Sequence, residues 1–187
     1  MAIKTPKGFT IYFAMLVGSL ALAVGIAIYD LTTREIDLSQ TATQSQYAIY
    51  AADTGAECAL YWDFKCQLSA CTQSGAAQSA FATSSTFVAP TTGVVCNGKD
   101  VAAIGTPPAS FVAPPTGWSA WSVVAPAGQG RATTTFYISF LPAKPYCVKV
   151  EVAKVGNPTV TTVTSHGYNT CQGGTGLRLE RILQVSY

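Results

Sequence analysis

An uncharged, proline-free run from Phe9 to Tyr29 constrains this chain more than any other feature of its sequence. A helix of about 21 residues, rising about 1.5 Å per residue, is about 30 Å long, which matches the hydrocarbon core of a bilayer. The basic residues Lys4 and Lys7 precede the run, and Asp30 follows it. This distribution predicts a membrane-spanning helix whose N-terminus stays in the cytoplasm while the rest of the chain is exported.

The helical pattern continues beyond the apolar run as an amphipathic segment. No proline follows the run until Pro90, and aromatic and small residues recur near helical spacing. We therefore expect one helix over residues 9–62, with its first half in lipid and its second half packed on a globular domain. Tyr47, Tyr61 and Trp62 are expected to anchor the core of that domain.

The remaining residues, 63–187, are enough for one domain with a hydrophobic core. Residues 63–90 are small and polar, which predicts a surface loop. Asn97-Gly98 lies between two short runs with strand-like alternation and predicts a type I′ hairpin, because both residues tolerate positive φ. Further strands are predicted over residues 118–124, 133–141, 146–155, 159–165 and 177–187. The expected fold is α+β, with the long N-terminal helix packed on a C-terminal antiparallel β-sheet domain.

The residues before the apolar run narrow the interpretation. The chain begins Met-Ala-Ile-Lys-Thr-Pro-Lys-Gly and becomes apolar abruptly at Phe9. A short basic leader that ends in Gly, followed by Phe and an apolar helix, resembles the class III signal of type IV pilins and pseudopilins. In that family, prepilin peptidase cuts after the Gly and methylates the new N-terminal Phe. The resemblance places this processing at Gly8 and Phe9, so residues 1–8 would be a leader that is not part of the fold.

The resemblance extends through the helix to about Trp62, and residues 51–58 (AADTGAEC) are similar to PilX-type minor pilins of bacteria. Beyond the helix it covers the architecture and short patches at residues 96–98, 146–148 and 167–171. It implies a structural subunit of a type IV pilus or related filament. Such a subunit is held in the cytoplasmic membrane by a single pass, with its C-terminal domain outside, and joins a cell-surface filament. Its partners would be other pilin subunits and the pilus assembly machinery.

The chain departs from the family pattern at two positions. Most pilins carry Glu at the fifth position after the cut, where this chain has Phe13. The proline that many major pilins carry later in the helix is absent, and Asp30 stands near its place. In the family, the Glu is thought to meet the charged N-terminus of the subunit above. The presence of Phe13 therefore predicts a low-abundance component at or near the filament tip.

Small residues are numerous within the apolar run. They include Gly18 and Gly25, and small side chains let helix backbones approach closely in lipid. Gly and Ala are also common in helices that merely anchor a protein. The leader context favours packing against other helices, so we expect an assembly surface that includes Phe13, Gly18 and Gly25.

All six cysteines follow the apolar run, which in an exported chain favours disulfides over metal ligands. The sequence does not determine their pairing. Cys147 and Cys171 flank a plausible hairpin, so we hypothesise that they pair. Cys58 would then join Cys96, and Cys66 would join Cys71 in a small local loop.

No constellation in the sequence predicts an enzyme, a metal site or a cofactor. The only histidine, His166, is expected at a strand end or loop. Asp53 and Glu57 are expected to solvate the helix or to pair with Lys or Arg. Residues 173–176 are glycine-rich, but a strand is predicted after them, which indicates a turn and not a phosphate-binding loop. A solvated or inter-subunit role is expected for the charged residues of the last strand, Arg178, Glu180 and Arg181.

The charge balance gives no case for nucleic-acid binding. Charged residues make up 11% of the chain and the net charge is +2. Without Lys4 and Lys7, the 11 basic residues become 9, equal to the 9 acidic residues. A neutral exported domain has no basic stripe that could follow a phosphate backbone.

Two other functions remain open. The first is a monomeric, membrane-anchored domain that binds a ligand outside the cytoplasm. The second is a secreted protein, because residues 21–23 and 25–27 resemble signal-peptidase sites, although the apolar run is long for a signal peptide.

Overall fold

The computed structural model describes residues 9–66, 79–83, 93–102, 122–140, 145–156, 159–171 and 178–187. The predicted leader, residues 1–8, lies outside these described residues. The chain divides into two units, the first ending at Thr43 and the second beginning at Gln44. The boundary falls inside the long helix, because the second half of the helix packs with the β-sheet domain.

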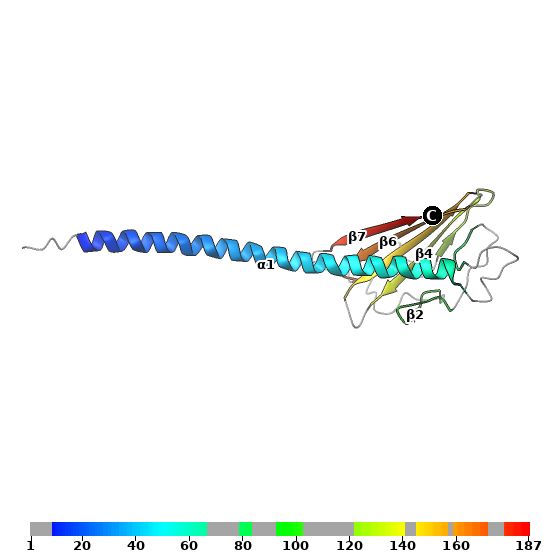
Figure 1. Cartoon of the computed structure of the whole chain (residues 1–187), viewed down its shortest axis with the longest axis horizontal. Helices are drawn as coiled ribbons and strands as arrows, with labels where there is room; N and C mark the ends of the chain where they lie inside the picture. The colour runs from blue at the N-terminus through cyan, green and yellow to red at the C-terminus, as the bar shows by residue number, and fades with distance from the viewer. Residues whose placement is uncertain are drawn as a thin grey trace, which may run out of the picture. The chain divides into compact units, whose positions relative to one another are not determined.

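One helix and seven strands make up the described residues, and they confirm the expected α+β arrangement (Figure 1). The helix α1 spans Phe9–Phe64 and continues two residues beyond its predicted end. The strands are β1 (Val95–Cys96), β2 (Lys99–Asp100), β3 (Ser122–Val124), β4 (Arg131–Ser139), β5 (Cys147–Val155), β6 (Val160–Tyr168) and β7 (Glu180–Ser186).

The main sheet is an antiparallel meander in the order β3-β4-β5-β6-β7, so every strand lies beside its neighbours in sequence. Its three central strands are nine residues long and pair along their whole length, from Arg131↔Val155 to Ser139↔Cys147 on one side of β5. β6 begins near its predicted start but extends three residues beyond the predicted end, Ser165. Each pair of strands needs only a local connection, which is the simplest way to build an antiparallel sheet.

The hairpin predicted at Asn97-Gly98 is present. β1 and β2 pair antiparallel on either side of it, with Cys96 opposite Lys99. Asn97 has φ 50° and Gly98 has φ 70°, so both turn residues adopt the left-handed conformation that a type I′ turn requires.

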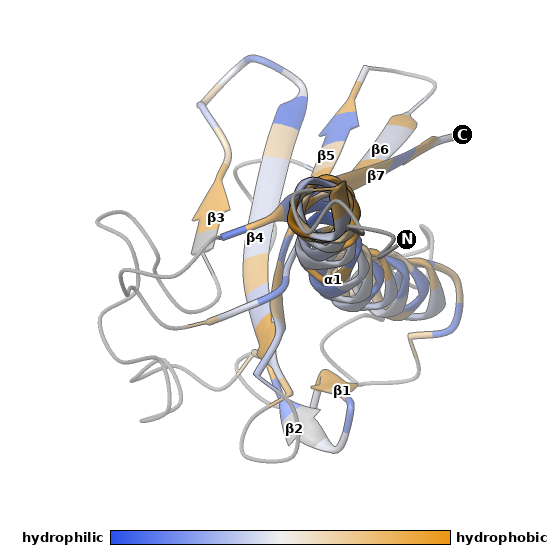
Figure 2. Cartoon of the chain, turned by 90° about the vertical axis from the view of Figure 1, so that its left-hand side faces the viewer, coloured by the Kyte–Doolittle hydropathy of each residue, from blue (hydrophilic) through white to orange (hydrophobic). Residues whose placement is uncertain are grey.

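Side chains alternate between the two faces of the sheet. On β5 the residues that face α1, Val148, Val150 and Val152, are fully buried, whereas Lys149 and Glu151 on the other face are partly exposed. Within the second unit, α1 lies across the buried face of the sheet (Figures 1 and 2). The core therefore lies between one helix and one face of one sheet.

A stripe of small residues lets α1 approach this sheet closely. The buried residues of the helix recur every three or four positions: Ala48, Ala51, Ala52, Gly55, Ala56, Ala59 and Asp63. A Cβ atom on Gly55 would lie 2.7 Å from Val148 and 2.8 Å from Val150. A Cβ atom on Gly167 of β6 would collide with the backbone of Ala48 and Ala52. The helix and β6 are thus in direct backbone contact.

Hydrogen bonds and aromatic contacts also connect α1 to the rest of the second unit. The hydroxyl of Ser165 donates to the carbonyl oxygen of Ala52 at 2.6 Å, and both residues are buried. Tyr47 stacks on Tyr146 with ring centroids 5.6 Å apart. The indole N–H of Trp62 donates to the Val95 carbonyl at 3.1 Å, which ties the helix to the β1–β2 hairpin. Tyr47 and Trp62 therefore make the expected anchoring contacts.

Two expectations about this region are wrong. Tyr61 does not anchor the core, because 56% of it is exposed and it packs edge-on against Trp62. Residues 79–83 do not belong to a surface loop, since Ala80, Phe81 and Ala82 are fully buried. Phe81 stacks on Phe136 of β4 at 5.8 Å, and this apolar contact draws the segment into the core. The rest of the predicted loop between residues 67 and 90, outside 79–83, lies outside the described residues.

We predict that Gly167→Ala destabilises the second unit by about 3 kcal/mol, the upper end of the range for overpacking, because the new methyl group meets helix backbone that no side-chain rotation can clear. Chemical denaturation followed by circular dichroism measures this loss. Thr164→Ala on the opposite face of the same strand is the matched control and should change stability far less. Equal effects of the two substitutions would contradict the close contact.

Candidate functional site

The first unit contains the segment that the sequence predicts to span a membrane. It consists of α1 up to Thr43, and the described part of the chain holds one helix long and apolar enough to cross a bilayer. None of its most apolar window is buried within the chain. Its large side chains are exposed, for example Phe9 at 71%, Phe13 at 58% and Leu20 at 65%. The helix is therefore compatible with a single membrane span, where lipid would cover these side chains.

Several hydroxyl groups of this segment bond back to carbonyl oxygens of the helix itself. The Ser19 hydroxyl donates to the carbonyl oxygen of Leu16 at 2.9 Å, and Thr32 bonds to Tyr29 in the same way at 2.9 Å. A spanning helix needs this, because a polar group in hydrocarbon without a partner is costly. Tyr12 and Tyr29 stand near the two ends of the apolar run, where aromatic side chains favour the membrane interface.

The three residues expected to form an assembly surface do not share one face of α1. Gly18 and Gly25 are seven residues apart, close to two full turns, so they lie on the same side. Phe13 precedes Gly18 by five residues and points about 140° away from it. A Cβ atom at either glycine would meet nothing within 4 Å. Neither glycine is therefore required by packing within its own chain.

The helix carries further apolar side chains after the predicted span ends. Leu31, Ile36 and Leu38 are 59%, 56% and 69% exposed, although charged residues surround them in the sequence. Lipid in a 30 Å core does not extend this far along the helix. Nothing in the described part of the chain covers them.

The structure contains one of the three predicted disulfides in full. Cys58 of α1 is joined to Cys96 of β1, with Cα atoms 5.9 Å apart. Cys66 is also disulfide-bonded. Its predicted partner, Cys71, lies outside the described residues.

The cysteines of the third predicted pair, Cys147 and Cys171, lie next to each other but are not disulfide-bonded in this structure. Cys147 and Cys171 are both buried in one small cluster with Tyr168, and both are free thiols. A disulfide here would close a loop of about 24 residues and stabilise the domain by about 3 kcal/mol. The pairing remains a prediction.

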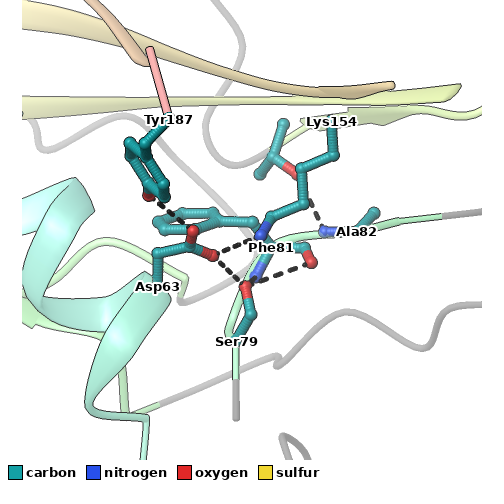
Figure 3. Close-up of polar contacts among 7 residues, drawn as sticks. Asp63, Ser79, Phe81, Ala82, Lys154 and Tyr187 are labelled. Atoms are coloured by element: carbon teal, nitrogen blue, oxygen red, sulfur yellow. Dashed lines mark hydrogen bonds and ion pairs between the residues drawn. The ribbon is translucent and has the colours of Figure 1, made fainter. Parts of the chain in front are cut away.

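A buried polar cluster joins the end of α1 to the far end of the sheet (Figure 3). The Lys154 ammonium of β5 lies 2.5 Å from the Asp63 carboxylate, and their side chains are only 6% and 4% exposed. The Tyr187 hydroxyl donates to the other carboxylate oxygen of Asp63 at 2.6 Å, and the Ser79 hydroxyl also donates to Asp63. Phe81 lies beside these polar groups (Figure 3). We call these residues the Asp63 cluster.

In the Asp63 cluster three donors, Lys154, Ser79 and Tyr187, surround one carboxylate that is almost closed to solvent. Partial burial and the hydrogen bond to Asp63 raise the pKa of Tyr187 above its usual 10.0. The folded state therefore favours the protonated phenol, so its contribution to stability is full below pH 10 and is lost as the pH rises further. The arrangement acts as a structural clasp, since its charged groups are paired with each other and almost closed to solvent.

This cluster was not predicted from the sequence. Asp63 and Lys154 are 91 positions apart, and Ser79 lies in a stretch whose composition predicts an exposed loop. The one available signal was the single acidic residue that ends the helical pattern. Its partner could not be identified without knowing which strand lies beside the helix.

A second polar cluster lies on the opposite face of the sheet. His166 of β6 is 2.7 Å from the Glu180 carboxylate of β7, and the Tyr168 hydroxyl donates to the same oxygen at 3.1 Å. The Arg178 guanidinium stacks over the Tyr168 ring, 4.1 Å from its centroid. His166 is thus inside a strand and not at its end as predicted, because β6 extends to Tyr168.

Neither cluster has the composition of a metal centre. No group of three metal-ligating side chains occurs among the described residues. Asp53 is exposed on α1, and so is Glu57, away from both clusters. The glycine-rich residues 173–176 lie outside the described residues. Comparison of the chain with family models, with curated proteins and with solved structures finds no match.

We predict that Lys154→Met destabilises the second unit by about 3–5 kcal/mol, because it leaves the Asp63 carboxylate buried without its counterion. Replacing both partners, as Asp63→Leu with Lys154→Met, should cost less than the sum of the single changes. Urea denaturation of the four proteins gives this coupling.

The matched control is Lys149→Met on the same strand. Lys149 also contacts a carboxylate at 2.5 Å, that of Glu151, but the two side chains are 27% and 35% exposed. Water screens such a pair, so this substitution should cost less than about 1 kcal/mol. A loss as large as that of Lys154→Met would contradict the role of burial.

Proposed function

We propose that this chain is a minor-pilin-like structural subunit of a type IV pilus or related filament, cut by prepilin peptidase after Gly8 and assembled through its apolar helix. The observation that carries the proposal is the division of α1. From Gln44 onward the helix is packed on its own sheet, whereas up to Thr43 its apolar surface meets nothing in the described chain.

Three features of the first unit support an assembly role. The glycines Gly18 and Gly25 leave one side of the helix open to close approach by another helix. A short leader that ends in Gly8 and is followed by Phe9 matches the sequence at which prepilin peptidase cuts members of the pilin family. The exposed apolar residues beyond the predicted span, such as Leu38, call for a protein partner since lipid does not reach them.

A monomeric membrane-anchored binding domain is the second candidate. All of residues 9–29 are exposed, which is equally what a lone anchor would show, since lipid alone can cover this surface. Phe13 favours this candidate as well, because it adds apolar surface where most pilins carry a charge. The two candidates differ in the fate of the leader and in the presence of the protein in filaments.

We predict that replacing Gly8 with a bulky residue, as in Gly8→Leu, leaves the full-length precursor in the membrane. A glycine allows the peptidase to approach the scissile backbone, and a large side chain would block it. Mass spectrometry of the N-terminal peptide should find methylated Phe9 in the parent protein and intact Met1 in the variant.

Gly25→Ala is the control for this experiment, because it changes the same helix without touching the junction and should be processed normally. Cleavage of Gly8→Leu to Phe9 at the normal rate would refute processing at this site. Intact Met1 in the parent protein would favour the simple anchor, and a start near Val24 or Ile28 would indicate secretion.

We further predict that the protein labels only the ends of filaments. Phe13 cannot accept the positive charge of a neighbouring N-terminus, so the chain should join poorly beneath another subunit, whereas its own Phe9 amine can still receive a Glu from the subunit below. Immunogold labelling of sheared filaments measures this distribution. Label along the whole length would refute a tip position, and an absence of label would favour the anchor.

A further inference from the structure

The thiols of Cys147 and Cys171 are neighbours at one end of the sheet. Cys147 opens β5, and Cys171 follows the end of β6. The backbone N–H of Cys171 donates to the carbonyl oxygen of Pro145 at 2.9 Å, which holds the two segments together. The two side chains are hydrogen-bonded to each other, and both are free thiols in this structure.

Tyr168 packs against this buried dithiol, and so does Tyr137. Tyr168 lies directly opposite Cys147 on the neighbouring strand and packs in the same cluster. Cys147 is 0% exposed, Cys171 4% and Tyr168 8%. The Tyr168 ring is itself held by Arg178 above it and by the Glu180 carboxylate at its hydroxyl.

Burial makes the pair a poor substrate for oxidation once the domain has folded. The hydrogen bond with Cys171 and, after it, burial raise the pKa of the Cys147 thiol, which suppresses the reactive thiolate. Thiol–disulfide exchange also requires that the sulfur be reached by its partner along the line of the breaking bond. In the folded domain neither condition is met without local opening.

We propose that the Cys147–Cys171 bond is introduced by a protein disulfide donor on the exported side before β5 and β6 close over the pair, and that a domain folded with the pair reduced is trapped as the dithiol. One cysteine thiolate attacks the donor disulfide and forms a mixed disulfide. The other cysteine then displaces the donor as its dithiol. Two protons leave the cysteines and two electrons pass to the donor, so the exchange balances.

The inference rests on the exported location in the proposed function, but its kinetic part does not. The reactivity of a folded dithiol can be measured on the purified full chain in detergent. Failure of the kinetic test would therefore leave the filament proposal untouched, and an unprocessed leader would leave the kinetic result standing.

The first experiment counts thiols in the full chain made in two ways. Protein exported to an oxidising compartment should show no alkylation of Cys147 or Cys171 by iodoacetamide after denaturation, whereas protein made in a reducing cytoplasm should show both alkylated. Peptide mass spectrometry distinguishes the two cysteines from the other four. Free thiols at both positions in the exported protein would overturn the proposal.

The second experiment compares rates. The reduced protein is treated with oxidised glutathione, once folded and once unfolded in urea, and the Cys147–Cys171 peptide is followed with time. The folded protein should form the bond at least about tenfold more slowly than the unfolded chain, since each exchange must wait for local opening. Equal rates in the two states would overturn the trapping.

Variants test whether Tyr168 is the cover. Tyr168→Ala should speed oxidation of the folded dithiol, whereas Tyr168→Phe, which keeps the ring and loses only the hydroxyl bond to Glu180, should stay close to the parent rate. Thr162→Ala on the same face of β6 is the control for a general loss of stability. Acceleration by Thr162→Ala equal to that by Tyr168→Ala would refute a specific cover.

Discussion

The contact between the backbones of α1 and β6 is the constraint on which the rest of the second unit depends. At Gly167 there is no space for even a methyl group, because the helix backbone at Ala48 and Ala52 occupies it. A helix that lies so close must present small residues along the whole of its buried stripe. In return, polar groups of the sheet come within reach of the helix backbone, as the bond from Ser165 to Ala52 shows. The Cys58–Cys96 disulfide and the Asp63 cluster then join the later turns of the helix to the hairpin and to the far end of the sheet.

Features with a local cause could be predicted from the sequence. The helix follows from an uninterrupted periodic pattern, and the turn at Asn97-Gly98 follows from two residues that tolerate positive φ. Strand positions were right to within a few residues, because alternation along a strand reflects its own two faces. The α+β class needed only these local signals. The end of β6 was missed because polar residues such as His166, which faces Glu180 across the sheet, carry no apolar alternation.

Features with a distant cause could not be predicted. Phe81 is buried because Phe136, 55 positions later, provides a ring for it to stack on, and composition around Phe81 indicates an exposed loop. Asp63 and Lys154 are buried together only because the last turn of α1 ends beside β5. Tyr61 was wrongly predicted as an anchor. Helical spacing alone does not determine which residues of a broad apolar stripe face the sheet. The predicted cleavage site between Gly8 and Phe9 is different, because a peptidase recognises a linear segment. Such a site can be predicted from adjacent residues alone.

One helix uses small residues in two environments, and the comparison bears on the assembly proposal. In the second unit, side chains of Ser165, Val148 and Val150 occupy the space beside Gly55 where a Cβ would lie. In the first unit, Gly18 and Gly25 have the same lack of side chain, but nothing within 4 Å of where a Cβ would lie. A lone anchor gains nothing from glycine there, since glycine lowers helix propensity by about 1 kcal/mol relative to alanine and exposes less apolar surface to lipid. Close approach by a second helix supplies the compensating contact, because in lipid helices associate through packing and not through hydrophobic exclusion. The glycines are thus better explained by a neighbouring helix than by lipid alone, which supports assembly over simple anchoring.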